Sequence, residues 1–498
     1  MVLKFWVVFR FDPFNQMNPG KVVVPYQSRE RIVQVDGPFR GYQDKLIPEK
    51  TRAIFSGAFD CNGNSACLNF DADHTMCPSA TISHNWVYSP KGRSALLREW
   101  LKQLSLMGYY PDASEPGTKK WLKSCINPHD FSAQVYESLD KCLGCKACAT
   151  ACPIKVDIPA MKSIFLAHFH HRYRRPLKDY VIKYIERIAS VQAKWPRCFN
   201  QLQKITIFQK IIEKSLKLVD TPMLSGHTLK QGLAKRKAPQ FSFKKLTNHH
   251  RQHDKVVCIV QDAFRSFYDA KVVFSIYDFL TKLGYIVYIL PFMESGKAAH
   301  VKGFLSYFIK KAKKAIDFYN QVAQFGFPLI GIDPSMALIY RDEYQRQFKH
   351  KVQFKVLLLQ EWLVGELDQL TPVFNKYKKI TNTAEQLETV YLFGHCSERA
   401  LVGSSMADWQ KIFNAFNILL NIAKVGCCGM AGTFGHEREN RDMSQDIFSS
   451  SWHKKIQHCG DLAKQNVLIS GFSCRCQVKR FSKQPFLHPI QYLLGAIQ

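Results

Sequence analysis

The chain has 498 residues, enough for two to four domains, and 46% of them are hydrophobic, which is typical of a globular protein rather than a disordered one. It has no run of 18 apolar residues and no signal-peptide cleavage pattern, so we expect a cytoplasmic protein without a membrane span. In that compartment, sixteen Cys favour metal binding over disulfides.

The formal charge of +29 comes from Lys and Arg that are densest in residues 168–251 and 310–314. A general basic bias of solvated faces is the simplest explanation. An acidic redox partner, or an anionic membrane surface that would hold the protein peripherally at the inner face of the membrane, comes next. Nucleic acid is not expected, because no nucleic-acid-binding motif accompanies the basic segments.

Four regions follow one another along the chain. Residues 1–51 are rich in Pro, Gly and Val, and residues 52–165 hold the first candidate ligands between helical stretches. Residues 166–252 are basic and helical in pattern, which indicates a linker. In residues 253–498 strands alternate with helices, which indicates parallel α/β units. We expect helices at residues 92–106, 180–191, 202–219, 269–283, 303–325 and 406–420, and strands at 21–25, 256–261, 286–290, 328–332, 389–394 and 466–470.

The strand–helix pattern occurs twice after residue 253, which predicts two similar α/β lobes. Laying residues 256–262 over residues 390–396 pairs Asp262 with Cys396, and the ends of the third strands pair Asp333 roughly with Cys474. In open α/β sheets, sites form at the carboxyl ends of strands. Only the second lobe has Cys at these ends, so we expect one cluster in this region rather than two.

The strongest motif is a CxxCxxCxxxCP run that consists of Cys142, Cys145, Cys148, Cys152 and Pro153. Three thiolates from one tight loop can bind three corners of an iron–sulfur cube, and the fourth Cys then serves a second cluster. Zinc is the alternative, but zinc sites usually use two separated CxxC pairs. The run therefore predicts two neighbouring clusters.

A partner motif lies upstream, at Cys61, Cys67 and Cys77. In two-cluster ferredoxins, the fourth Cys of each run binds the cluster of the other run. Cys77 would therefore complete the cluster of Cys142, Cys145 and Cys148. Cys152 would join Cys61 and Cys67 at the other cluster. Asn64 stands where a middle Cys is usual. This second site can therefore hold a [3Fe–4S] cluster, or a [4Fe–4S] cluster with a non-Cys ligand, unless the upstream Cys are loop residues and only one cluster forms.

The last group of candidate ligands is formed by Cys396, Cys427, Cys428 and Cys474. Two neighbouring thiolates on a turn that Gly429 permits can hold a cluster from one side, while the other two arrive from different strand ends. Buried structural Cys are the alternative.

Several other residues have no assigned role. His395 and His436 lie near the last group, but a single His in such a loop more often makes hydrogen bonds. The spacing leaves open whether Cys476 binds. The Cys that fit no motif are Cys125, Cys198, Cys258 and Cys459.

With a CxxCxxCxxxCP run followed by Cys-Cys-Gly, the chain resembles the iron–sulfur subunits of glycolate oxidase, anaerobic glycerol-3-phosphate dehydrogenase and heterodisulfide reductase. It is also similar to long fused bacterial proteins, of the D-lactate and D-2-hydroxyglutarate dehydrogenase type, that join an FAD-linked oxidase to an iron–sulfur half. The similar segments are Asp12-Pro13, Met17-Asn18-Pro19-Gly20-Lys21, Cys61-Asn62-Gly63-Asn64, Met76-Cys77-Pro78-Ser79, Ser89-Pro90-Lys91-Gly92-Arg93 and Gly426-Cys427-Cys428-Gly429-Met430-Ala431-Gly432.

The resemblance implies a multidomain protein. Residues 1–51 would be the remnant of an FAD-linked oxidase C-terminal segment, and residues 52–165 an α-helical, two-cluster ferredoxin-like domain. The basic helical linker, residues 166–252, would lead to a two-lobed α/β Cys-Cys-Gly domain at residues 253–498. FAD would come only through a partner chain, such as an FAD-linked oxidase subunit encoded upstream, and the catalytic residues are unknown.

The resulting hypothesis is a relay that passes electrons from a partner flavin, which oxidises a 2-hydroxy acid, to a quinone or another acceptor. One alternative is a cluster-based disulfide or quinone reductase of the heterodisulfide-reductase kind. Another is a non-functional fragment of a split fused dehydrogenase gene.

Overall fold

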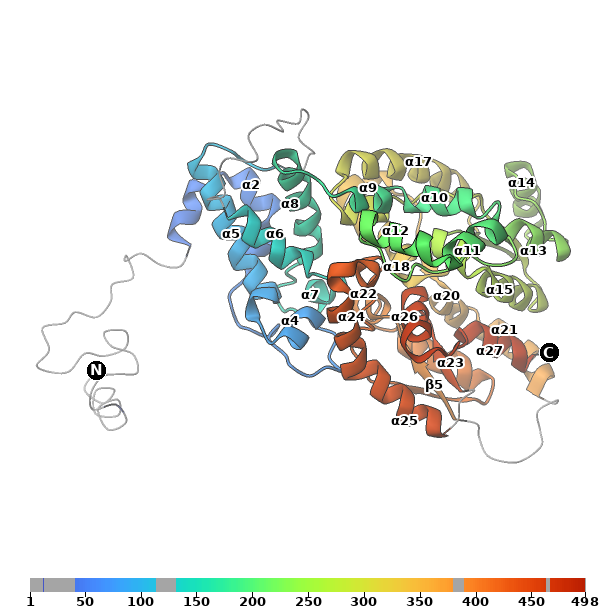
Figure 1. Cartoon of the computed structure of the whole chain (residues 1–498). Helices are drawn as coiled ribbons and strands as arrows, with labels where there is room; N and C mark the ends of the chain where they lie inside the picture. Colours follow the sequence, from blue (N-terminus) through green and yellow to red (C-terminus); the bar gives the residue numbers. More distant parts are fainter. Residues whose placement is uncertain (1–11, 13–40, 113–130, 379–388, 463–465, 498) are drawn as a thin grey trace, which may run out of the picture.

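A computed structural model describes residue 12 and residues 41–112, 131–378, 389–462 and 466–497 (Figure 1). Most of the expected oxidase remnant at 1–51, including its strand at 21–25, lies outside the described residues, and so does Cys125.

The first part of the described chain is helical. Its longest early helix, α5, begins after the N-cap Ser89, whose hydroxyl accepts from the Gly92 N–H, and has a Pro in its first turn. Trp100 of α5 is buried edge-on against Phe55 and Phe165, which joins three helices into one apolar core. The elements are η1(Tyr42–Leu46), α2(Glu49–Ile54), α3(Ser56–Asp60), α4(Pro78–Ser83), η2(Trp86–Tyr88), α5(Pro90–Leu106), α6(Ser132–Asp140), α7(Ala147–Thr150) and α8(Ile158–Arg172).

The basic region is also helical, but in shorter pieces than the sequence pattern predicts. The expected helix at 180–191 is interrupted at Tyr184, and the expected helix at 202–219 is interrupted at Ile205, whose backbone is extended. Periodicity alone does not reveal such breaks, because the apolar pattern continues through them. The helices are α9(Leu177–Lys183), α10(Ile185–Gln192), α11(Pro196–Lys204), α12(Thr206–Leu216), α13(Leu229–Lys235) and α14(Phe243–Gln252).

Two parallel sheets follow, and they share one topology. The first has the strand order β2-β1-β3-β4 and the second the order β6-β5-β7, so a central strand lies between the next two strands in both. The strands are β1(Val256–Val260), β2(Ile286–Ile289), β3(Leu329–Gly331), β4(Val356–Leu358), β5(Thr389–Phe393), β6(Leu419–Ile422) and β7(Val467–Ile469). The sequence pattern missed β4 and β6, and the helix expected at 406–420 ends at Ala415, four residues before β6 begins.

Helices cover both sheets. Those of the first sheet are η4(Phe264–Tyr268), α15(Ala270–Lys282), α16(Lys297–Val301), α17(Leu305–Ala323), α18(Pro334–Ala337), η5(Leu338–Tyr340), α19(Glu343–Phe348), η6(Lys349–Lys351), α20(Leu359–Gly365) and α21(Leu367–Lys378). Those of the second are α22(Cys396–Leu401), α23(Ser405–Ala415), η7(Phe434–His436), η8(Arg438–Asn440), α24(Arg441–Phe448), η9(Ser449–His453), α25(Lys454–Leu462), α26(Phe472–Ser482) and α27(Pro489–Ala496).

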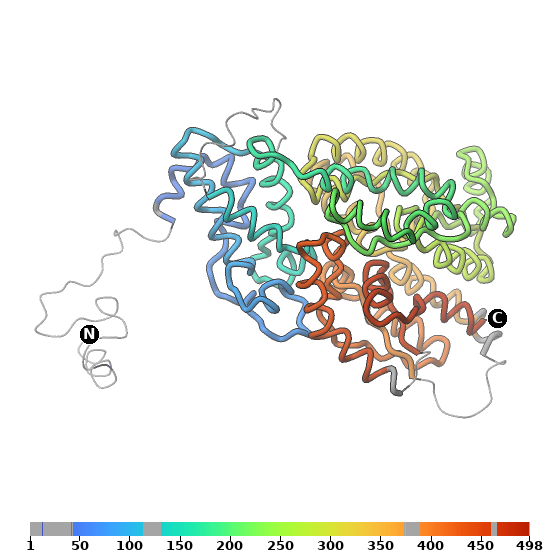
Figure 2. Tube along the Cα trace, in the orientation of Figure 1, coloured from blue at the N-terminus to red at the C-terminus, as the bar shows by residue number. Residues whose placement is uncertain are grey.

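A single apolar core joins the two sheets. It contains Val257 and Ile259 of β1 together with Val390 and Leu392 of β5, and α27 at the end of the chain packs on α15 of the first sheet. The tube in Figure 2 shows the helical N-terminal part beside the second sheet, where α4 lies against α24. The N-terminal helices therefore pack on helices that cover the second sheet, α4 on α24 and α7 on α22, although they lie far apart in sequence.

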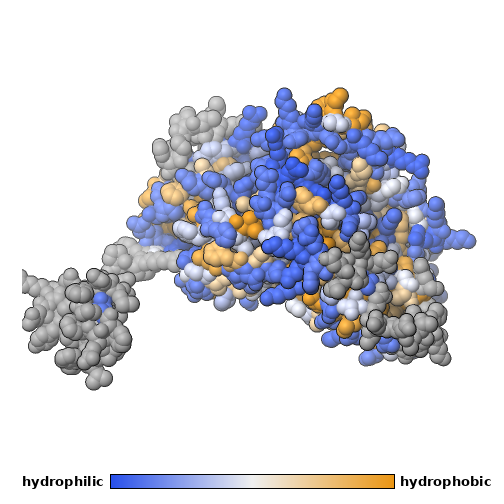
Figure 3. All heavy atoms as spheres, turned by 60° about the horizontal axis from the view of Figure 1, so that its bottom comes forward, coloured by the Kyte–Doolittle hydropathy of each residue, from blue (hydrophilic) through white to orange (hydrophobic). Residues whose placement is uncertain are grey.

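One face of the molecule is drawn as a surface of atoms in Figure 3. The face in Figure 3 is largely hydrophilic, with small groups of apolar side chains between charged ones. Among the described helices, none combines the length and the hydropathy that a membrane crossing requires.

Candidate functional site

Four of the predicted ligands line one cavity. Cys142, Cys145 and Cys148 lie between α6 and α8, and Cys77 directly precedes α4. Gly144 has a φ of 70°, a conformation that glycine adopts without strain, and it lets the chain turn between the first two thiols. The cavity has about 300 Å³ of empty space, part of it open to solvent. The structure thus brings Cys77 into one cavity with Cys142, Cys145 and Cys148, the four Cys that the sequence assigns to one cluster.

A buried cation lies against one of these thiols. The Arg93 guanidinium donates to Cys77 Sγ at 3.4 Å and to Ser79 Oγ at 3.0 Å, and its Nε donates to the Ser138 carbonyl at 3.0 Å. Arg93 is only 2% exposed, so water screens its charge weakly. A thiolate at Cys77 would therefore receive a charge-assisted hydrogen bond.

The second predicted set is only partly defined by contacts. Cys67 lies near Cys61 and Cys77, whose charges add to burial in raising the pKa of the Cys67 thiol. Cys152, which follows α7, packs against the apolar cluster that contains Cys67, and so does Cys61. These three thiols belong to or border the same apolar core, and their role as ligands stays a prediction.

The last group converges from three segments. Cys396 is the first residue of α22, the adjacent Cys427 and Cys428 follow β6, and Cys474 lies in α26. Neighbouring thiols, in the order Cys396, Cys427, Cys428 and Cys474, influence one another's pKa. The interaction with Cys427, followed by burial, raises the pKa of Cys396 well above its usual value. The four strand-end thiols therefore meet at the carboxyl edge of the second sheet.

Glycines make the Cys-Cys-Gly turn possible. Gly429 has a φ of 85°, and a Cβ there would lie 2.3 Å from the Ser444 carbonyl oxygen. Its N–H points at Cys427 Sγ, 3.4 Å away. A Cβ on Gly426 would lie 2.2 Å from the Ala72 carbonyl oxygen. The turn is thus pressed between α24 and the loop that precedes Cys77, which leaves no room for a side chain at either glycine.

The two groups of thiols are neighbours. Cys145 packs against the apolar cluster that contains Leu143, Cys396 and Cys427. The charge of Cys396 contributes to the raised pKa of Cys145, after burial, and the charge of Cys145 contributes to that of Cys427. Helix α7, which follows Cys145, also contacts α22, which begins at Cys396. Thiols that lie 251 positions apart in sequence are thus brought close together.

The chemistry of these sites fits iron–sulfur clusters. Burial raises the pKa of Cys145 and Cys148, and the four thiols of the last group are buried as well. Thiolates in such apolar surroundings require cations as partners, and bound iron supplies them. In the described part of the chain, no three His, Cys, Asp or Glu side chains meet as ligands of a single metal ion. The thiolates that hold a cluster bind different irons, so their sulfurs need not meet at one point.

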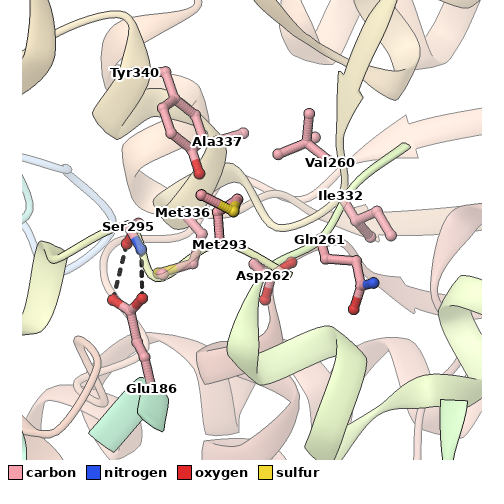
Figure 4. Close-up of a pocket in the computed structure, with 11 residues that line it drawn as sticks. Glu186, Val260, Gln261, Asp262, Met293, Ser295, Ile332, Met336, Ala337 and Tyr340 are labelled. Atoms are coloured by element: carbon pink, nitrogen blue, oxygen red, sulfur yellow. Dashed lines mark hydrogen bonds between the residues drawn. The ribbon is translucent and has the colours of Figure 1, made fainter. Parts of the chain in front are cut away.

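The first sheet has a matching edge that is lined without Cys (Figure 4). Asp262 follows β1 there, and Met293 lies in the loop after β2. Burial, aided by the charge of Asp333, raises the pKa of Asp262 to about 7. Burial acts to raise the pKa of Asp333 as well, but the Arg265 guanidinium, 3.6 Å away, and His395 hold it below its usual value. Carboxylates and an arginine thus occupy the position where the second sheet has thiols.

This acidic edge also supports the second sheet. Asp333 Oδ2 accepts from the Phe472 N–H at 2.9 Å, and Arg265 donates to the Ser470 carbonyl. Both contacts fix the segment that immediately precedes Cys474. Figure 4 shows Glu186 from the linker at the same pocket, where it accepts from the Ser295 N–H at 2.5 Å and from the Ser295 hydroxyl at 2.8 Å.

The two histidines near the last group make hydrogen bonds. His395 Nδ1 accepts from the Ser397 N–H at 3.1 Å and caps α22, while its Nε2 lies 3.2 Å from Ser473 Oγ. His436 Nδ1 lies 3.1 Å from the Val219 carbonyl oxygen. Of the other Cys, Cys459 of α25 is buried in the apolar cluster that also contains Cys428 and Cys474, and the half-buried Cys476 packs against that cluster. Cys258 lies in β1, and Cys198 is exposed.

Sequence reasoning missed the charged residues around the thiols. Arg93 stands in a segment that the family resemblance singled out, but no spacing relates it to Cys77. Lys162 donates from its Nζ to the Cys142 carbonyl at 2.9 Å. Lys146 forms ion pairs with Asp342 and, at 3.1 Å, with Glu343 of the first sheet. Such long-range contacts leave no local pattern that could reveal them.

Comparison with known proteins agrees with the Cys pattern. A family model described as a 4Fe-4S dicluster domain matches residues 57–156. The chain is 42% identical over 503 residues to a D-2-hydroxyglutarate dehydrogenase of Pantoea ananatis and 40% identical over 504 residues to one of Escherichia coli. Each match covers 98% of this chain and 48% of the relative, so the chain spans about half the length of these relatives.

A more distant similarity connects the chain to one component of a multi-subunit enzyme. The chain is 22% identical over 339 residues to a subunit of the anaerobic glycerol-3-phosphate dehydrogenase of Escherichia coli, and the match covers 65% of this chain and 78% of that protein. No solved structure matches the chain. The chain therefore carries a 4Fe-4S dicluster domain, and its similarity to dehydrogenases supports an electron-transfer role in an oxidoreductase.

Proposed function

We propose that the chain is the electron relay of a 2-hydroxy-acid dehydrogenase, with D-2-hydroxyglutarate as the substrate class that the relatives' names indicate. Oxidation of the hydroxy acid to the oxo acid releases two electrons and two protons, and reduction of a quinone consumes both. In this proposal the hydroxy acid and FAD bind to a partner polypeptide that corresponds to the half of the relatives without a counterpart here. Bound iron–sulfur clusters supply single-electron transfer.

One observation carries the proposal: Cys145 of the dicluster domain packs in the same apolar cluster as Cys396 and Cys427. Two thiol groups from distant parts of the chain have no structural need to meet in this way. Electron transfer between two clusters does require such proximity, and an apolar boundary keeps water away from both. We assign Cys77, Cys142, Cys145 and Cys148 to one site, Cys61, Cys67 and Cys152 to a second, and Cys396, Cys427, Cys428 and Cys474 to a third.

The chain's own residues hold these sites in place. Arg93 orients Cys77, and Lys162 fixes the backbone of Cys142. The matching topologies of the two sheets support a two-lobed Cys-Cys-Gly domain over residues 253–498, with thiols in the second lobe alone. In the same scheme, residues 52–165 form the ferredoxin-like domain and residues 166–252 the linker, and the site of Cys61 and Cys67 holds either three or four irons.

The test is anaerobic reconstitution of the full chain, followed by iron analysis and low-temperature EPR of the reduced protein. We expect about twelve irons per chain for three [4Fe–4S] clusters, or about eleven with one [3Fe–4S] cluster. The Cys427→Ser/Cys428→Ser double variant should lose about four irons. It should also lose the magnetic interaction of the third cluster with the dicluster domain, while the interaction between the two dicluster centres remains. Cys198→Ser, at an exposed Cys outside all three groups, is the matched control.

The relay itself is tested by mixing the reduced chain with a water-soluble quinone. The EPR signals of the reduced dicluster domain should disappear fast in the wild-type protein, because the clusters are oxidised by the quinone, and slowly in the double variant. Zinc in place of iron, or an unchanged iron content in the double variant, would rule out the assignment. Turnover of a disulfide by the reduced chain without any flavoprotein would instead favour the heterodisulfide-reductase-like alternative.

A further inference from the structure

Helices α11 and α12 carry an unusual number of exposed apolar side chains. Trp195 is 61% exposed, Leu202 37%, Ile205 50%, Ile207 71% and Ile211 57%. Isolated apolar residues on a surface need no explanation. Here five of them fall within 17 consecutive residues, on two adjoining helices and the turn between them.

The spacing shows that α12 is apolar on more than its inner side. Phe208, Ile212 and Leu216 recur every four residues and are half-buried against the rest of the molecule. Ile207 and Ile211, also four residues apart, project outward instead. On α11, Asn200 faces inward, where it exchanges two hydrogen bonds of 2.9 Å with Leu224. The exposed apolar residues are therefore additional to those that hold the two helices in place.

Cations surround these apolar residues. Residues 194–217 contain six Lys and Arg and one acidic residue, Glu213, for a net charge of +5. All six basic side chains are exposed; they are Lys194, Arg197, Lys204, Lys210, Lys214 and Lys217. Mixed apolar and basic side chains on short helices match the chemistry of an anionic lipid surface, because the apolar groups enter the head-group boundary while the cations meet lipid phosphates.

We propose that this α11–α12 face, defined by the five apolar and six basic residues above, docks the chain onto an anionic lipid bilayer. Trp195 fits this occupant, because its amphipathic ring favours the membrane–water boundary. A polypeptide partner would need an unusually acidic surface to match a charge of +5 on 24 residues. Docking at a bilayer would also bring the chain to where a lipid-soluble quinone resides. The proposal does not depend on electron transfer, because lipid binding requires no cluster chemistry.

The test measures binding of the reconstituted full chain to vesicles of phosphatidylcholine with and without 30% phosphatidylglycerol, by co-sedimentation at about 0.1 M salt. We expect binding to the anionic vesicles, weaker binding at higher salt, and little binding to the neutral ones. Each lysine near an anionic lipid surface contributes to the binding free energy, and the contributions add. The triple variant Lys204→Gln/Lys210→Gln/Lys214→Gln should therefore lower the partition coefficient by about a hundredfold. Ile207→Gln/Ile211→Gln should lower it by at least about tenfold.

Matched controls remove the same groups elsewhere. Lys411→Gln/Lys424→Gln/Lys454→Gln deletes three exposed lysines that lie on elements of the second sheet, and Leu106→Gln/Met107→Gln deletes two exposed apolar residues at the end of α5. Both control variants should bind like the wild-type protein. Equal binding to neutral and anionic vesicles, no binding at all, or equal losses in the control and α11–α12 variants would each overturn the proposal. Iron content and circular dichroism check that every variant is folded.

Discussion

At the scale of single residues, the charge nearest to a predicted ligand is the most informative feature. Arg93 is anchored by Ser79 and by the Ser138 carbonyl, and these contacts hold the guanidinium against Cys77 Sγ. Residues that contact a metal ligand in this way set both the affinity for the metal and its reduction potential. Arg93 is therefore a positioning residue for the first site.

We predict that Arg93→Gln lowers the iron affinity of the first site by about 10- to 100-fold. It should also lower the reduction potential of that site, because a nearby cation favours the more negative reduced state. Redox titration followed by EPR measures the second effect. Arg93→Lys keeps the charge and should retain a potential closer to that of the wild type, which distinguishes an electrostatic role from a structural one.

The control for this pair is Arg98→Gln, on the same helix, because Arg98 pairs with Asp44 and contacts none of the candidate thiols. Its iron content and potentials should match the wild type. Equal potentials in Arg93→Gln and the wild type would contradict the assigned role.

The sequence identified the Cys residues of the candidate sites, but it did not identify the charged residues that surround them. Cys142, Cys145 and Cys148 lie within seven residues, in a loop and the start of the short helix α7, so their spacing brings the three thiols to one cavity. Cys77 was added by the exchanged-ligand pattern, and the structure places it in their cavity. Arg93, by contrast, reaches Cys77 across 16 residues through tertiary packing, which no local pattern encodes.

At the scale of elements, the Cys-Cys-Gly turn shows how tightly backbone and ligands are coupled. Gly429 needs its positive φ to bring two adjacent thiols to one side, and the Ser444 carbonyl of α24 occupies the space where a side chain would be. Gly432, three residues later, also has a positive φ, of 65°, but no atom lies within 4 Å of the position of its Cβ. A side chain at Gly432 would thus meet backbone strain alone, whereas a side chain at Gly429 would meet both strain and a steric clash.

We predict that Gly432→Ala costs about 1–2 kcal/mol of stability, from strain alone. Gly429→Ala should cost more, because the same strain adds to the clash with Ser444, and it should remove about four irons while the dicluster signals remain. Thermal unfolding and iron analysis of both variants provide the measurement. Loss of the dicluster signals in Gly429→Ala would show that the third site does not form independently.

The elements themselves were predictable where periodicity and flanking residues agreed. The helices expected at 269–283 and 303–325 correspond closely to α15 and α17, whose apolar stripes end where the helices end. The expected helix at 202–219 was wrong because the apolar pattern continues through the break at Ile205. The short strand β4 was missed because three residues carry too little pattern.

At the scale of the whole molecule, buried ion pairs connect three regions. Lys302 Nζ lies 2.8 Å from Glu437 Oε1 and 3.3 Å from Asp179 Oδ1, and Lys178 Nζ lies 2.5 Å from Glu437 Oε2. Burial acts to lower the pKa of Lys302, but Glu437 and Asp179 raise it above its usual value, so the side chain stays charged. The network joins helix α9, the first sheet's helices α16 and α17, and the segment after the Cys-Cys-Gly turn.

We predict that Lys302→Met lowers the free energy of unfolding by about 3–5 kcal/mol, because it leaves Glu437 and Asp179 buried with one cation fewer. Urea denaturation of the reconstituted chain measures the change. The Lys302→Met/Glu437→Gln double variant should recover part of the loss.

An exposed pair provides the control for this prediction. Arg438 and Glu213 lie 3.5 Å apart with side chains 61% and 42% exposed, so Arg438→Met should cost at most about 1 kcal/mol. A loss in Lys302→Met as small as that in Arg438→Met would contradict a connecting role for the network.

The acidic edge of the first sheet has a consequence for the second sheet. Asp333 accepts a hydrogen bond from the Phe472 N–H, and Arg265 donates one to the Ser470 carbonyl, so both residues fix the backbone just before Cys474. A lobe without thiols at its own strand ends thereby positions a candidate ligand of its neighbour. Variation at Asp333 or Arg265 is therefore expected to matter for the second lobe as much as for the first.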